Sequence, residues 1–131
     1  MNDIKTLLVD ALNILGCDSS RFNFDAHSTI VMSFDDVGDI LLDQVDDQLW
    51  IWGALPDVMV DVLGGCAHDL LRELTTPVEY LAAGAITLCA EEQGLRLGGM
   101  FQREYLEESK HFAAAIEGFY LRLVQIKESI K

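Results

Sequence analysis

The strongest constraint on the fold is a run of three strand-like segments that follow one another with very short connections. The first, 28–34, is rich in β-branched residues, the second is 40–45, and the third, 48–55, reads QLWIWGAL. The connections contain Gly38 and the pair Asp46-Asp47, which are residue types typical of tight turns. Strands joined this closely pair as antiparallel neighbours. We therefore predict a three-stranded meander at the centre of the fold.

Apolar residues at helical spacing flank this meander on both sides. One helix is predicted over 4–15, ending at Gly16, and a second from Asp57 to about Leu74. A last helix is predicted from about Glu104 to Ser129. Its apolar residues recur at spacings of four and three, which predicts one buried stripe of Phe112, Ile116, Phe119, Leu123, Ile126 and Ile130.

Three glycine-containing or irregular segments complete the prediction. Residues 17–26 are expected to form a loop, and 84–90 with 95–101 a hairpin. Gly98-Gly99 inside the hairpin indicates either a bulge or a close backbone approach. Gly64-Gly65 indicates either close packing of another helix or a local kink. The whole chain, 1–131, is expected to form one α+β domain of order α-β-β-β-α-β-β-α, with three helices packed on a twisted antiparallel sheet.

The charge of the chain excludes one large class of partners. The 131 residues carry 22 acidic and 9 basic side chains, a net charge of −13. Such a surface repels nucleic acid and attracts basic partners, although the same charge would also serve solubility alone. No apolar run approaches the ~20 residues that span a bilayer, and no signal peptide opens the chain. We therefore expect neither nucleic-acid binding nor membrane insertion.

The cysteines and histidines do not form a recognisable metal or catalytic pattern. Cys17, Cys66 and Cys89 are widely spaced and odd in number, which favours free thiols in a reducing cytoplasm. Cys66 and His68 stand two apart on a predicted helix and so point in different directions. The acidic run 35–47 does not satisfy the ligand spacing of a calcium loop. We expect no cofactor, no bound metal and no intramolecular disulfide.

The tryptophans of the third strand carry the clearest functional signal. Trp50 and Trp52 project from one face of the strand, and Leu49 and Ile51 project from the other. Both faces are therefore apolar, whereas a domain with three helices covers one sheet face well. The second face is either additional core or a docking surface, and the pattern leaves both interpretations open.

Two stretches of the sequence resemble a known family. The segment Asp25-Ala26-His27-Ser28-Thr29-Ile30-Val31 and the strand Leu49-Trp50-Ile51-Trp52 are similar to those of class I type III secretion chaperones, in particular the multi-effector (class IB, InvB/SpaK-like) branch. The predicted order of helices and strands, the length and the low pI also agree, as does Gly118-Phe119-Tyr120 in the last helix.

The resemblance implies a non-enzymatic cytoplasmic homodimer of a Gram-negative bacterium. It would bind the N-terminal regions of secreted effector proteins without a cofactor and keep them non-globular. The secretion ATPase or the sorting platform is a further candidate partner. Asp39, Asp43 and Asp47 are candidates for an acidic rim. The candidate effector-binding residues are Leu8, Leu12, Leu15, Ile30, Met32, Phe34, Leu42, Trp50 and Trp52. The candidate dimer-interface residues are Met59, Val60, Leu63, Cys66, Ala67 and Leu70.

Two other classes of function compete with this prediction. One is a dimeric adaptor or regulatory protein that binds a folded partner. The other is a small enzyme that uses Cys17 or His27. Stabilisation of a co-expressed effector through its N-terminal region would distinguish the chaperone from both.

Overall fold

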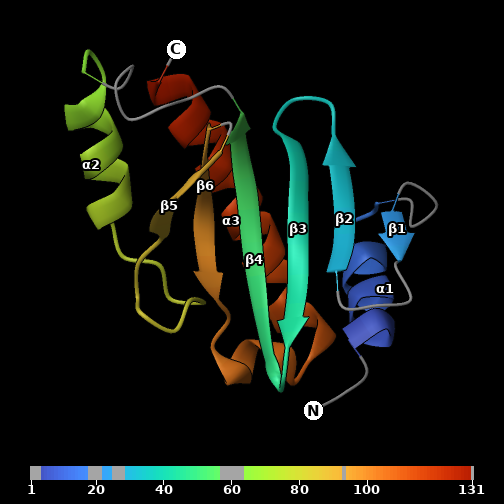
Figure 1. The fold of residues 1–131 in the computed structure, drawn as a ribbon. Coiled ribbons are helices and arrows are strands. Elements are labelled where there is room, and N and C mark those ends of the chain that lie inside the picture. The colour runs from blue at the N-terminus through green and yellow to red at the C-terminus, as the bar shows by residue number, and fades with distance from the viewer. Residues whose placement is uncertain (1–3, 18–21, 25–28, 57–63, 93, 131) are drawn as a thin grey trace.

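The chain forms a six-stranded antiparallel sheet with helices on one face (Figure 1). The computed structural model describes residues 4–17, 22–24, 29–56, 64–92 and 94–130. Along the chain the elements are α1 (Ile4–Ile14), β1 (Phe22–Phe24), β2 (Thr29–Phe34), β3 (Gly38–Val45), β4 (Gln48–Pro56), α2 (Ala67–Thr75), β5 (Thr87–Glu91), β6 (Gly94–Met100), the 3-10 helix η3 (Arg103–Leu106) and α3 (Ser109–Ser129). The strands lie in the order β1-β2-β3-β4-β6-β5. The predicted α+β fold is confirmed.

The meander of β2, β3 and β4 forms where the sequence predicts it. Its β3–β4 turn contains Asp46 with φ of 56°, a left-handed conformation that Asp tolerates better than most residues. The β2–β3 turn closes with Gly38 at φ of 77°. Val37 beside it is 1 % exposed, and its carbonyl accepts a hydrogen bond from Lys127 of α3. The hairpin tip is therefore fastened to the last helix.

Several boundaries differ from the prediction. The hairpin expected at 84–90 and 95–101 forms as β5 and β6, with β5 beginning three residues later than expected. Residues 22–24, expected within a loop, form β1, which pairs with β2 from Phe22 opposite Met32 to Phe24 opposite Ile30. Three residues are too few for a recognisable alternation, and the pairing comes from the free edge of β2. The last α-helix begins at Ser109 and not near Glu104, because the extended Glu108 separates it from the 3-10 helix η3.

The second predicted helix also begins later within the described residues. Its described part is α2, Ala67–Thr75, and 57–63 lie outside the residues that the structure describes. Gly64 and Gly65 are exposed and lie in the turn before α2, and no atom of the described residues lies within 4 Å of the place of an added Cβ. The turn at 64–66 interrupts the helix predicted over 57–74, and both interpretations of the glycine pair stay predictions.

One face of the sheet packs against α1 and α3 (Figure 1). Ile30, Leu42 and Ile51 align across β2, β3 and β4, and all three are buried. Gly53 lies on the same face, where an added Cβ would come within 2.8 Å of Leu123, so it lets α3 approach the sheet closely. The stripe predicted for the last helix is confirmed from Phe112 to Ile126, with Ile130 partly buried. None of the described helices is long and apolar enough to cross a membrane.

Specific contacts with α3 hold α2 and the segment that follows it. The Arg122 guanidinium lies 3.5 Å from the Glu73 carboxylate, and both side chains are largely buried. Arg122 also donates to the Glu73 main-chain carbonyl. The Tyr80 ring lies on Gly118, where an added Cβ would come within 3.0 Å of it. Burial raises the pKa of Tyr80 to about 12.

Candidate functional site

The nine residues predicted to bind an effector do not form one surface. Strand alternation places Ile30, Met32 and Leu42 on the sheet face that packs against the helices. It places Trp50 and Trp52 on the opposite face, because Trp52 pairs with Leu41 and not with Leu42. The prediction could not choose between the faces because apolar residues alternate on both.

Five of the nine residues belong to the hydrophobic core: Leu12, which also lines a groove described below, and four others. Leu8, Met32 and Leu42 have no exposed surface, and Ile30 is 8 % exposed. Leu8 projects from α1 and the other three from the sheet, so they join the helix layer to the strands. In this state of the protein they stabilise the fold and present no surface to a partner.

A second group lines an apolar groove between α1 and α3, with a volume of about 380 Å³. From the predicted set it includes Leu12, Leu15 and Phe34. Leu12 is almost fully buried, whereas Leu15 and Phe34 are half-buried. The remaining lining residues are Cys17, Ile116, Glu117, Tyr120 and Leu121. A groove of this composition fits apolar side chains and has one carboxylate in its lining.

Five of the groove residues were not in the predicted set, and Leu121 and Tyr120 are the two with the clearest roles. Leu121 is 52 % exposed, and together with half-buried Leu15 and Phe34 it forms part of a continuous apolar surface. It stands off the buried stripe of α3, and this displacement is a signal that the sequence already contained. Tyr120 belongs to the stretch that resembles the secretion chaperones, but its position in the groove depends on tertiary packing.

Tyr120 ties the rim of the groove to the β2–β3 turn. Its ring packs on Phe34 with centroids 5.1 Å apart, and its hydroxyl donates to a carboxylate oxygen of Asp36. This hydrogen bond lowers the pKa of Asp36 and raises the pKa of Tyr120. One wall of the groove is therefore held in place by a bond between elements far apart in the sequence.

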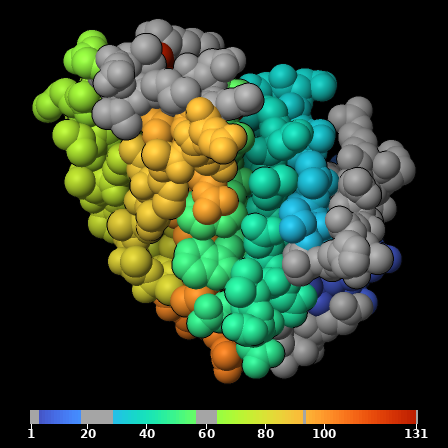
Figure 2. All heavy atoms as spheres, viewed as in Figure 1, coloured from blue at the N-terminus to red at the C-terminus, as the bar shows by residue number. Residues whose placement is uncertain are grey.

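The tryptophans lie on the sheet face that no described helix covers, and coloured strand atoms form the middle of that face in Figure 2. Their rings are nearly parallel, with centroids 5.7 Å apart and 5° between planes. Arg96 of β6 places its guanidinium 4.3 Å from the centre of the Trp52 ring. Trp52 is only 7 % exposed because its own neighbours cover it, whereas Trp50 is half-buried. The two tryptophans therefore have different roles.

Two acidic residues of the predicted rim have structural partners on this same face. Asp43 accepts a hydrogen bond of 2.6 Å from the Thr29 hydroxyl, and Asp39 accepts one of 2.8 Å from Ser33. Both bonds join β2 to β3 at directly opposed residues. Asp47 is exposed in the β3–β4 turn.

The described part of the predicted dimer surface is partly internal. Leu70 is 3 % exposed and packs in the core of its own protomer. Cys66 and Ala67 are half-buried, and the exposed apolar residue of α2 is Leu71, at 59 %. Met59, Val60 and Leu63 lie outside the described residues. The sequence pattern did not separate the inner from the outer side of α2.

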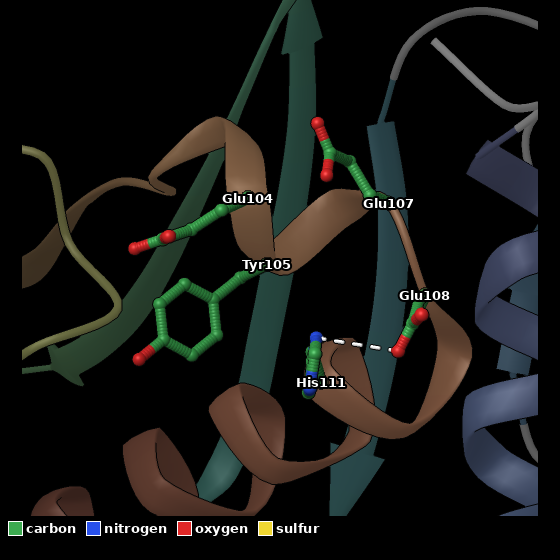
Figure 3. A pocket seen from close by; sticks show the side chains of 5 residues that line it. All are labelled: Glu104, Tyr105, Glu107, Glu108 and His111. Atoms are coloured by element: carbon green, nitrogen blue, oxygen red, sulfur yellow. Dashed lines mark ion pairs between the residues drawn. The ribbon is translucent and has the colours of Figure 1, made fainter.

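A third surface, beside η3, is polar. Glu104, Tyr105, Glu107, Glu108 and His111 line a pocket of about 500 Å³ (Figure 3). His111 Nδ1 lies 3.6 Å from Glu108, but more than half of each side chain is exposed. Figure 3 shows the three glutamates pointing in different directions, so their carboxylates do not converge on one point. Within the described residues no group of three or more His, Cys, Asp or Glu side chains could hold a metal.

The thiol and imidazole considered for an enzyme are not brought together within the described residues. Cys17 is half-buried in the apolar groove, whose described lining includes no histidine. His27 lies outside the described residues, as does most of the stretch 25–31 that carries the family resemblance.

Comparison with known proteins places the chain in a class associated with type III secretion and host invasion. The model of the invasion protein B family matches residues 16–92. The surface presentation of antigens protein SpaK of Salmonella typhimurium is 30 % identical over 129 residues, which cover 98 % of this chain and 96 % of that protein. SpaK of Salmonella typhi matches to the same extent. The chain belongs to the invasion protein B family and is SpaK-like along nearly its whole length.

Proposed function

We propose that this protein is a type III secretion chaperone. It binds the N-terminal chaperone-binding segments of one or more effectors and keeps them stable, non-globular and competent for secretion. It acts as a cytoplasmic homodimer in a Gram-negative bacterium, without catalysis or cofactor. The observation that carries the proposal is the open apolar groove between α1 and α3, and membership of the invasion protein B family supports it.

The groove supports binding of an extended segment in a simple physical way. Apolar side chains of the segment enter between Leu15, Phe34 and Leu121, and burial of their surface drives association. The segment gains no globular core of its own and so remains unfolded while it is protected. At the sheet edge β1 has β2 as its one neighbour in the sheet and so offers main-chain groups for strand addition.

Leu121→Asp is expected to abolish retention of an effector segment while leaving the chaperone folded. Leu121 is 52 % exposed, so the fold tolerates a charge there, whereas a bound apolar segment would bury that charge without a partner. We expect at least about a tenfold loss of affinity, which corresponds to ~1.4 kcal/mol. The measurement is co-purification with the co-expressed N-terminal segment of an effector from the same secretion system.

Ala83→Asp is the control for this variant. Ala83 is exposed in the connection between α2 and β5, away from the groove, and the substitution introduces the same charge. It should retain the segment fully. If Leu121→Asp also retains it, the groove is not the binding site. If the protein captures an effector that lacks its N-terminal region, it is an adaptor for a folded partner.

We expect Leu71 to contribute to the dimer interface and Leu70 to contribute to the core of its own protomer. Leu71→Asp should leave the protomer folded and shift sedimentation toward the monomer, because Leu71 is the exposed apolar residue of α2. Leu70→Asp should lower the free energy of unfolding by about 3 kcal/mol or more, since it places an unpaired charge in the core. Sedimentation of Leu71→Asp as an unchanged dimer would remove this part of α2 from the interface.

A further inference from the structure

The tryptophan stack on the outer sheet face is a series of flat groups, and among the described residues a cation lies at its Trp52 end. Arg96 lies over Trp52, and Trp52 lies parallel to Trp50. A guanidinium over an indole is favoured by the charge distribution of the ring, and the indole is the best aromatic partner for it. Arg96 thus shows, within the protein itself, the kind of group that this stack accepts.

The other end of the series is Trp50. The next residue along β4 on the same face, on the side away from Trp52, is the exposed Gln48. Across the sheet, Asp43 of β3 and Met100 of β6 stand directly opposite Trp50. The Thr29 hydroxyl bond fixes the Asp43 carboxylate at this position. Trp50 and Asp43 are therefore cross-strand neighbours on one face of the sheet, and Gln48 lies on the same face.

The charge of this face argues for a basic occupant. Among the described strand residues that register places on it, Asp39, Asp43 and Glu91 are acidic and Arg96 is basic. Arg96 is already paired with Glu91, at 3.7 Å. A second copy of the chain would bring the same surplus of acid to the contact, whereas a basic segment is complementary to it.

We infer that Trp50 is the docking point for an arginine side chain of the bound polypeptide, with Asp43 as its charge partner. Arginine is favoured over lysine because its planar guanidinium stacks on the indole while donating to the carboxylate. The inference rests on the proposed function, since the arginine belongs to an effector segment that continues beyond the groove. Trp50 and Asp43 would select for arginine on the sheet face opposite to the groove.

The test uses a synthetic peptide of alternating valine and arginine, and the same peptide with citrulline in place of arginine. Citrulline keeps the shape of the side chain and removes its charge. We expect the arginine peptide to bind about fivefold or more tightly, measured by fluorescence anisotropy, as a cation–π contact beside a carboxylate would give. In NMR spectra the shift should centre on the Trp50 indole N–H.

Two variants locate the effect. Trp50→Leu should remove the preference for arginine over citrulline. Asp43→Asn keeps an oxygen that can accept the Thr29 hydroxyl bond, so the fold should persist while the preference falls about threefold. The Trp50 indole should also be open to acrylamide quenching in the native assembly.

Three results would overturn the inference. They are equal affinity for both peptides, a peptide-induced shift that leaves the Trp50 indole untouched, and protection of Trp50 from acrylamide, which would mean that a second copy covers this face. The groove proposal fails by a separate result, full effector retention by Leu121→Asp. The ratio of the affinities for the arginine and citrulline peptides is measured independently of effector retention, so the two proposals can fail separately.

Discussion

Trp52→Ala is expected to lower the free energy of unfolding by about 3–5 kcal/mol, although Trp52 lies on the sheet face away from α1 and α3. The reason is local cover. Trp50 stacks on one side of its ring, Arg96 lies over it, and Gly98 opposes it across the sheet. Only 7 % of the side chain is exposed, so truncation leaves a cavity and removes two ring contacts.

Trp50→Ala is the matched comparison. It removes the same type of side chain from the same face, but from a half-buried position at the end of the stack. Trp50→Ala should lower the free energy of unfolding by about half as much as Trp52→Ala or less, because less apolar surface becomes exposed to water. Urea denaturation of both variants gives the comparison. Equal destabilisation would mean that Trp52 is not specially covered by its neighbours.

Gly98→Ala is expected to prevent the native pairing of β4 with β6. An added Cβ would lie 1.8 Å from the Ile51 carbonyl oxygen and 2.9 Å from the Trp52 ring. The first of these atoms belongs to the backbone of a central strand, so no side-chain rotation relieves the overlap. We expect a loss of about 3 kcal/mol or more, at or above the upper end of ordinary overpacking.

Gly64→Ala provides the control for this substitution. Gly64 is exposed, and within the described part of the chain no atom lies within 4 Å of the place that its Cβ would occupy. Thermal unfolding of Gly64→Ala should match that of the unsubstituted protein, whereas Gly98→Ala should be poorly soluble or melt much earlier. A Gly98→Ala protein of normal stability would mean that the two strands are not packed as described.

The sequence predicted those parts of the fold that depend on local pattern. The β2–β3–β4 meander follows from alternation and turn residues, and the buried stripe of α3 follows from its spacing of four and three. Of the two readings of Gly98-Gly99, the structure selects the close approach, since the β4–β6 register continues unbroken through both residues. The short edge strand β1 had no pattern long enough to detect.

The candidate site was harder to predict because it depends on which face of each element turns inward. Met32 and Trp52 are both apolar strand residues, yet one lies in the core and the other on the outer face. Leu70 and Leu71 are neighbours on α2 with opposite exposure. The groove adds Leu121 from a helix more than 100 positions from Leu15, and only tertiary packing brings these two residues to one surface.

The acidic residues of the first half of the chain also gain a specific meaning from the structure. Asp39 and Asp43 hold β2 to β3 through opposed hydroxyl groups, and Asp36 accepts the Tyr120 bond at the groove rim. From composition alone these acidic residues would be explained by solubility or by attraction of a partner. The structure shows that they also stabilise local contacts. The negative charge of these residues should change the rate at which a basic partner associates more than the affinity of the complex.

Site-specific photo-crosslinking tests the central claim most directly. A benzophenone-bearing amino acid is placed at position 121 in the groove or at position 83 outside it, and the chaperone is irradiated with a co-expressed full-length effector. We predict a crosslink from position 121 to the N-terminal segment of the effector, and none from position 83. Equal crosslinking from both positions, or a crosslink from position 121 only to the folded part of the effector, would contradict the account.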